Sequence, residues 1–365
     1  MQDIYAHIAK LRTANQLIAG RHHPKPNEVV GWFGAMQAQD YPAAKWAIAA
    51  RSTTVTNTDI EQLITEKQLV RTWPMRGTIH FVQPADVGWM LELMAGRVFQ
   101  KFASVHAALG LNQSHFDLCT HTLEEAMKRR ALIRKQMYAA LTEAGANVEG
   151  QRLYHTIVYL AHRGLLAIAE LQEKQPTFVW FDSWFPKANR RHLDRTASLV
   201  QMAQYYVQSH GPVTVHDFAW WTGLTVADAR EAFRLLDDRI VQLPEAPEYW
   251  LMADSLPVAG TPDSVFLAPS FDESIVALKD RGAIVRPEDF KKLTPYANGI
   301  FKPAILVNGR FVGTWKRVQK AKGVIIHCEI LHTLTKAQSD ALGFAAERYA
   351  AFLEQSLVEV TRKNL

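Results

Sequence analysis

Groups of two or three helical segments, each followed by a β-rich hairpin, recur loosely along this 365-residue chain. In the first group, helices are expected at residues 4–18, 28–36 and 43–51. A fourth helix is expected to begin at Thr58, because Glu61 three residues later completes a capping box. Residues 69–73 and 78–82 then read as two strands around a turn, which would form a wing. A chain of this length exceeds the usual size of one domain, so several packed modules are expected.

The remaining groups carry local signals of the same kind. Helices are expected at 114–130, 136–143 and 151–163, with strands at 165–168 and 177–181. Residues 187–195 read as a linker. A helix-turn-helix follows, in which Thr214 and Asp217 open one helix, Gly223 lies in the turn, and Thr225 with Asp228 caps the next helix.

The C-terminal part reads as strands and a closing helix. Asn308-Gly309 between apolar runs indicates a type I′ hairpin, and a strand at 324–334 precedes a helix at 336–354. A small β-barrel fits these signs. We therefore predict an α+β chain of four modules, with boundaries at 1–83, 84–192, 193–260 and 261–365.

Composition narrows the class of protein. Hydrophobic residues make up 48% and charged residues 21%, which is ordinary for a globular protein, and no apolar run approaches the length of a membrane span. The start of the chain lacks a signal-peptide pattern, and the two cysteines are far apart, so a reducing cytoplasm is expected. His22-His23 has no companion ligands at metal-binding spacing, and we expect no metal and no cofactor. The formal charge of +5 permits binding to nucleic acid.

Two carboxamides stand beside a carboxylate in Met36-Gln37-Ala38-Gln39-Asp40. Residues two apart share a side only in extended backbone, so Gln37 and Gln39 converge only if the preceding helix ends near Met36. Pro42 favours that ending, since proline disfavours helical geometry in the residue before it. Two converged amides suit holding a water molecule or a sugar edge near phosphates. The alternative is a helix end whose glutamines face solvent.

Four motifs in a fixed order connect the chain to a known family. They are Gly34-Ala35-Met36-Gln37-Ala38-Gln39-Asp40, Arg71-Thr72-Trp73-Pro74-Met75-Arg76-Gly77-Thr78-Ile79-His80, Pro269-Ser270-Phe271-Asp272 and Gly309-Arg310-Phe311-Val312-Gly313-Thr314-Trp315. With these motifs the chain resembles the AlkZ-like bacterial DNA glycosylases, which act on alkylpurines and crosslinks. The resemblance implies tandem winged helices followed by a small β-barrel, and a glutamine motif involved in cleavage of the N-glycosidic bond. Some relatives carry aspartate at the second glutamine, whereas this chain has the double-amide form.

The resemblance gives the glutamines a chemical role. An N7-alkylated purine is cationic and leaves readily, so the enzyme must stabilise a cationic sugar and position a water molecule beneath it. Gln37 and Gln39 would hold that water. Asp40 would either stabilise the cationic sugar or cap the helix that starts near Pro42. The expected function is a monofunctional DNA glycosylase for cationic N-alkylated purines, with interstrand crosslinks as a further substrate class.

Basic side chains in these motifs, in the helix after the glutamines and in the run after Trp315 are candidate DNA contacts: Lys45, Arg51, Arg71, Arg76, His80, Lys316 and Arg317. Contacts of this kind to phosphate oxygens set the register of a protein on a duplex. Each of these residues has an ordinary alternative as solvated surface, or for His80 as a half-buried polar group. The expected partner is double-stranded DNA, which a monomer would bind in the cytoplasm at the nucleoid. No interaction with a membrane is expected. A winged-helix DNA-binding or regulatory protein without catalysis, or a protein-interaction scaffold, are the alternative functions.

Overall fold

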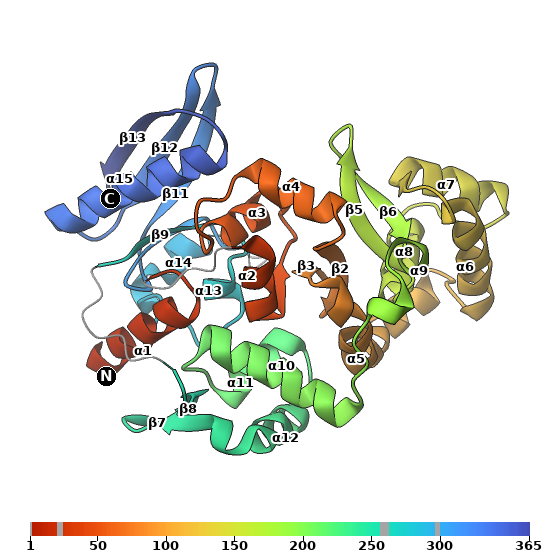
Figure 1. Ribbon diagram of the computed structural model, residues 1–365, viewed down its shortest axis with the longest axis horizontal. Coiled ribbons are helices and arrows are strands. Elements are labelled where there is room, and N and C mark those ends of the chain that lie inside the picture. Colours follow the sequence, from red (N-terminus) through yellow and green to blue (C-terminus); the bar gives the residue numbers. More distant parts are fainter. Residues whose placement is uncertain (1, 20–24, 256–262, 296–299) are drawn as a thin grey trace. The chain divides into compact units, whose positions relative to one another are not determined.

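The computed structural model describes residues 2–19, 25–255, 263–295 and 300–365 (Figure 1). The chain has a mixed α+β fold and divides into two compact units. The first unit contains residues 1–60, 200–221 and 225–365, and the second contains residues 61–199 and 222–224. The division into four modules stays a prediction, and its last boundary, at 260–261, lies outside the described residues.

The first unit begins with helices around one short strand. Their order is α1 (Gln2–Asn15), α2 (Pro26–Phe33), β1 (Ala35–Gln37) and α3 (Tyr41–Ala49), and α4 (Asn57–Thr65) leads on to the second unit. The capping box of α4 lies two residues before the predicted pair of Thr58 and Glu61. Thr56 and Asp59 bond reciprocally, whereas the Thr58 hydroxyl donates to Glu354 at 2.5 Å.

A helical segment returns to the first unit after residue 199. It consists of α10 (Arg195–His210), α11 (Val215–Thr222) and α12 (Val226–Leu236), followed by the hairpin of β7 (Ile240–Leu243) and β8 (Ala246–Met252). The predicted capping box of α12 is confirmed, since Thr225 and Asp228 bond to each other in both directions. Gly223 has a φ of 78° in the turn between α11 and α12, where a side chain would be strained.

The first unit ends in a five-stranded sheet. Its order is β13-β12-β11-β10-β9, formed by β9 (Val265–Ala268), β10 (Ala304–Val307), β11 (Arg310–Lys320), β12 (Gly323–Ile330) and β13 (Leu357–Asn364). Asn308 and Gly309 have φ values of 51° and 78° between β10 and β11, as the predicted type I′ turn requires. Within the described residues the sheet is open, with β13 and β9 at its edges, so the predicted closed barrel is not confirmed.

Helix α15 (Lys336–Phe352) covers this sheet (Figure 1). It meets α3 through an aromatic cluster. The Trp46 indole donates to the Leu267 carbonyl and the Trp315 indole donates to the Ala268 carbonyl, each at 2.8 Å. Both indoles pack edge-on against Tyr349, with ring centroids 4.9 and 5.0 Å away. Strand β9 therefore anchors the helix that follows the glutamine segment, and two short helices, α13 (Glu273–Val276) and α14 (Phe290–Leu293), continue from it.

The second unit contains the predicted hairpin of β2 (Val70–Met75) and β3 (Thr78–Val82), which pair from Val70–Val82 to Met75–Thr78. The strand order here is β3-β2-β5-β6-β4, with β4 (Leu132–Ile133), β5 (Leu166–Gln172) and β6 (Gln175–Trp180). The helices are α5 (Val87–Ala108), α6 (Gln113–Met127), α7 (Arg134–Glu143), α8 (Arg152–His162) and α9 (Phe181–Trp184). Buried side chains of α6, α7 and α8 pack with this sheet into one apolar core.

Two negative observations hold for the described part of the chain. None of its helices combines the length and the apolar character that crossing a bilayer requires. Within the same residues, no three histidine, cysteine, aspartate or glutamate side chains gather as metal ligands. His22 and His23 lie outside the described residues.

Candidate functional site

The glutamine segment begins where α2 ends. Helix α2 stops at Phe33, so the prediction that helical geometry continues through Met36 is wrong. Gly34 has a φ of 73°, and a Cβ at this position would overlap the ring of Tyr205. A glycine is needed here both for the backbone conformation and for the close approach. The chain then runs as the buried strand β1, and Gln37 therefore has the extended backbone that convergence of the two amides requires.

A buried carboxylate holds the backbone of Gln37. The Gln37 N–H donates to Oε1 of Glu273 at 2.6 Å, and the Trp221 indole donates to Oε2 at 3.0 Å. Nε2 of His210 lies 3.4 Å from the same Oε2. All four residues are at most 9% exposed, so the carboxylate is fixed in an environment without bulk water. Glu273 was missed by sequence reasoning, although it directly follows the recognised Pro269-Ser270-Phe271-Asp272 motif.

The three predicted catalytic side chains have different environments. Gln37 is 9% exposed, and no residue of the described chain forms a hydrogen bond with its carboxamide. Gln39 is exposed. The Asp40 carboxylate accepts the Ala43 N–H at 3.1 Å and caps α3, which is the structural one of its two predicted roles. The backbone of Gln37 is thus held by Glu273, while the donors and the acceptor of its side chain stay available.

The turn that carries Glu273 is anchored by a second buried carboxylate. Asp272 accepts two hydrogen bonds from the Arg51 guanidinium, at 2.9 and 2.8 Å, and neither side chain is exposed. Arg51 also donates to the carbonyls of Gln16 and Ala47. The sequence places Arg51 among the DNA contacts. The structure corrects this, because its guanidinium is buried and hydrogen-bonded to these partners.

Lys45 is also placed away from the surface. Its side chain is 5% exposed, and its ammonium lies 4.4 Å from the centre of the Tyr41 ring. The structure therefore places Lys45 in the interior, which corrects its predicted role as a DNA contact.

The β2–β3 hairpin carries three further predicted contacts. Arg71 is 5% exposed and lies over the Phe81 ring at 6.0 Å, and His80 is fully buried with Nδ1 2.9 Å from the Thr78 carbonyl. Both are interior side chains, which corrects their predicted role as DNA contacts. Arg76 is half-buried at the tip of the hairpin, where its φ is 56° and its side chain packs on Gly223.

The C-terminal sheet exposes the last two predicted contacts. Lys316 and Arg317 are exposed on β11, and the Arg317 guanidinium donates to the Tyr349 hydroxyl at 2.5 Å. Burial raises the pKa of Tyr349, and the nearby Arg317 opposes that shift. Lys320 and Lys322 are exposed near the end of the same hairpin. Of the seven predicted contacts, Lys316 and Arg317 are thus the pair that lies on a cationic surface.

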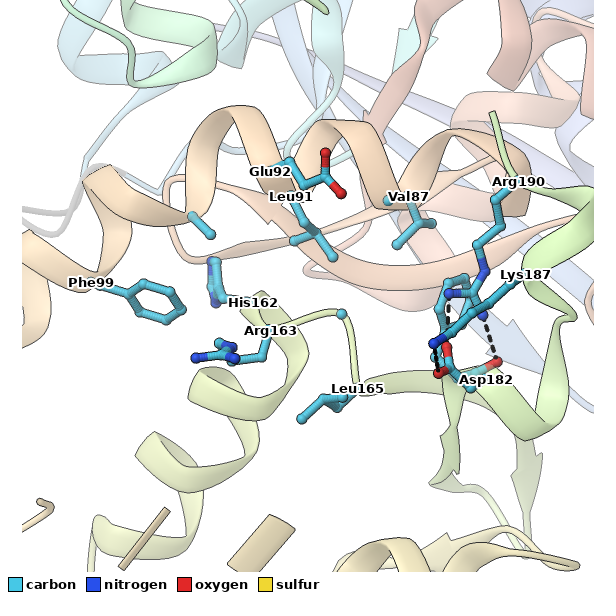
Figure 2. Close-up of a pocket in the computed structure, with 14 residues that line it drawn as sticks. Val87, Leu91, Glu92, Phe99, His162, Arg163, Leu165, Asp182, Lys187 and Arg190 are labelled. Carbon is cyan, nitrogen blue, oxygen red and sulfur yellow. Dashed lines mark hydrogen bonds and ion pairs between the residues drawn. The ribbon is translucent and has the colours of Figure 1, made fainter. Parts of the chain in front are cut away.

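A cavity of about 490 Å³ lies within the second unit (Figure 2). Apolar side chains of α5 form one wall, and the end of α8 forms another. At one end Asp182 forms ion pairs with Lys187 at 3.1 Å and with Arg190 at 2.8 Å, as the dashed lines show. These two cations come from the segment that the sequence assigns to a linker. His162 lines the cavity as a buried side chain, and burial lowers its pKa to about 4.

The fold and the glutamine segment define a class of protein. Residues 30–352 match the family described as "DNA glycosylase AlkZ-like". The chain belongs to this family, and it is accordingly an enzyme of the DNA glycosylase class, the hydrolases of N-glycosyl bonds.

Two comparisons with one organism, Streptomyces sahachiroi, agree with this membership. The chain is 22% identical over 332 residues to a protein named "Interstrand DNA cross-link repair glycosylase". The match covers 88% of this chain and 90% of the relative. The solved structure of the DNA glycosylase AlkZ from that organism superposes with a TM-score of 0.82 at 21% identity. The superposition covers 98% of this chain and 99% of the other, and it shows that the two proteins share a fold.

Proposed function

We propose that this chain hydrolyses the N-glycosidic bond of cationic N-alkylated purines in double-stranded DNA, including bases that link the two strands. Gln37 and Gln39 would together position the attacking water. The observation that carries the proposal is the buried carboxamide of Gln37, which stays unengaged by the described residues while Glu273 holds its backbone. The name of the Streptomyces sahachiroi relative supports crosslinks as a substrate class.

The chemistry fits neutral amides. A cationic alkylpurine needs little help to leave, and the sugar that remains develops positive charge. Gln37 can accept a hydrogen bond from water through Oε1, while its NH₂ group donates to a second acceptor. Gln39 can do the same from the exposed side. Groups fixed before the reaction cost no reorganisation when the charge develops. Asp40 contributes by holding the start of α3 in place.

A crosslinked base is joined to both strands and cannot rotate fully out of the duplex, as flipped bases do. An enzyme for such a lesion must therefore approach the base within the double helix. We propose that the helical segments with their hairpins serve as winged helices, and that the C-terminal sheet takes the place of the small barrel. Arg76, Lys316 and Arg317 would contact phosphates, since these three predicted cations are not buried.

The test is release of 7-methylguanine from a methylated duplex under single-turnover conditions. The Gln37→Ala and Gln39→Ala variants should each lose about 10²–10³ in rate, as expected when one preorganised polar group is removed. Gln100→Ala is the matched control, because this glutamine is exposed on α5 and should retain full activity.

Two results would overturn the assignment of roles. Base release at the wild-type rate by both alanine variants would show that the glutamines do not act on the water. Tight, salt-sensitive binding to duplex without base release by the wild type would instead support the DNA-binding or regulatory alternative.

A further inference from the structure

A small cavity in the first unit is lined by three residues with buried polar atoms that have no hydrogen-bond partner in the described part of the chain. Arg12 and Gln16 reach it from α1 and the turn after that helix, and Ser274 reaches it from α13. Leu306 and Gly309 of the β10–β11 hairpin close another side. Its volume of about 10 Å³ is room for one water-sized particle.

Arg12 is the dominant group at this cavity. Its side chain is 4% exposed, its Nε donates to the Pro212 carbonyl at 2.9 Å, and its guanidinium lies 5.7 Å from the centre of the Tyr249 ring. Nη1 and Nη2 have no partner among the described residues. Oε1 of Gln16 and Oγ of Ser274 are likewise buried without a partner in that part of the chain.

The neighbouring carboxylates bind other groups. Asp272 is paired with Arg51, Glu273 accepts from the Gln37 N–H and the Trp221 indole, and Asp280 accepts the Tyr249 hydroxyl at 2.5 Å. No described carboxylate lies within ion-pair distance of Arg12. A buried cation without an anion is unfavourable, because burial removes hydration that nothing replaces.

We propose that this cavity binds one monatomic halide ion, with chloride as the ordinary occupant. The two η nitrogens of Arg12 and the hydroxyl of Ser274 would donate to it. Gln16 would donate its NH₂ group after the amide turns by 180°, since the two amide orientations fill the same space. Phosphate and sulfate are too large for the cavity, and the Arg12 charge excludes a cation. A water molecule could accept from Arg12 but would leave its charge uncompensated.

The ion would connect two parts of the first unit. Helix α1 supplies Arg12, and Ser274 belongs to the turn that also carries Asp272 and Glu273. Those two carboxylates hold Arg51 and the backbone of Gln37. Halide binding would therefore connect α1 to the turn that supports the glutamine segment. This inference does not depend on the proposed function.

Bromide is the probe, since it substitutes for chloride and scatters X-rays anomalously. Crystals grown in sodium bromide should show one anomalous peak in this cavity. In urea unfolding at constant ionic strength, replacing sodium gluconate by sodium bromide should raise the wild-type midpoint and saturate. Arg12→Met should abolish the difference between the two salts. Arg97→Met, at an exposed arginine of α5, should retain it.

A second variant keeps the test decisive if Arg12→Met fails to fold. Ser274→Ala should raise the bromide concentration for half-saturation about tenfold, as expected for one lost hydrogen bond to an ion. Equal half-saturation in Ser274→Ala and the wild type would overturn the site. A water molecule in the cavity of bromide crystals, or an equal bromide effect in Arg12→Met and Arg97→Met, would overturn it as well.

Discussion

Arg51 and Asp272 form a bidentate ion pair in which both side chains are completely buried, with N–O distances of 2.9 and 2.8 Å. The pair joins the turn after α3 to the turn before α13. Because the next residue, Glu273, holds the Gln37 N–H, the ion pair also sets the position of the glutamine segment. A completely buried charge pair therefore contributes to the geometry of the candidate site.

Asp272→Asn should destabilise the first unit. Asparagine keeps the volume and can still cap α13, so the change removes the negative charge and leaves Arg51 buried without its partner. Breaking a buried pair in this way commonly costs about 3–5 kcal/mol. The free energy of unfolding, measured by urea denaturation, should fall by this amount. Glu231→Gln, in the exposed pair of Arg234 and Glu231, is the control and should leave it unchanged. Equal stability of the two variants would contradict the prediction.

Gly34→Ala should impair both stability and base release. The positive φ costs about 1–2 kcal/mol for an L-residue, and overlap with the Tyr205 ring adds the roughly 1–3 kcal/mol typical of overpacking. The control is Gly96→Ala in α5, where a Cβ would meet nothing within 4 Å. That substitution should stabilise the protein by up to about 1 kcal/mol, since alanine favours helix. Unfolding midpoints that move in the same direction for both variants would refute this account.

Local chemistry made several elements predictable. The reciprocal bonds of Thr225 and Asp228, and the positive φ values at Asn308 and Gly309, depend on residues adjacent in sequence. Helix α5 was missed because its apolar residues are not confined to one face and two glycines interrupt it. Strand β13 is not predicted because it pairs in parallel with β12, and no turn signal in the sequence indicates a parallel partner.

The candidate site was predictable only in part, for the same reason. The spacing of Gln37 and Gln39 and the nearby proline are local, and they correctly indicated extended backbone at Gln37. The partners of the site are distant, since Glu273 lies 236 positions from Gln37 and Asp272 lies 221 positions from Arg51. An arginine in a predicted helix, with no acid nearby in sequence, is typical of a surface position, and the sequence alone therefore places Arg51 among the DNA contacts.

Acid should destabilise the second unit through His162. Nδ1 of this buried ring lies 2.8 Å from the Val158 carbonyl, and burial lowers its pKa from 6.5 to about 4. The unfolded chain therefore binds the proton first as the pH falls. Stability is full above pH 6.5 and decreases toward pH 4, by about 3 kcal/mol if the whole shift is realised.

His162→Leu should flatten that pH dependence, measured as urea unfolding midpoints from pH 7.5 to 4.5. Phe99→Leu is the control, because this ring packs against His162 at 6.2 Å but does not titrate. It should lower stability at every pH and keep the wild-type slope. Identical slopes for the wild type and His162→Leu would show that the buried imidazole is not the titrating group.

Lys316→Met should reduce the salt dependence of duplex binding. If Lys316 contacts a phosphate, DNA binding by the variant releases one fewer counterion. The slope of log K against log salt should then become shallower by about 0.9. Fluorescence anisotropy with an unmodified duplex, at salt concentrations from about 50 to about 200 mM, measures this change. Lys45→Met is the matched control, because that ammonium is buried over Tyr41 and should not contribute to the slope. A change of slope in Lys45→Met but not in Lys316→Met would place the duplex on a different surface, since counterions are released only where a cation meets a phosphate.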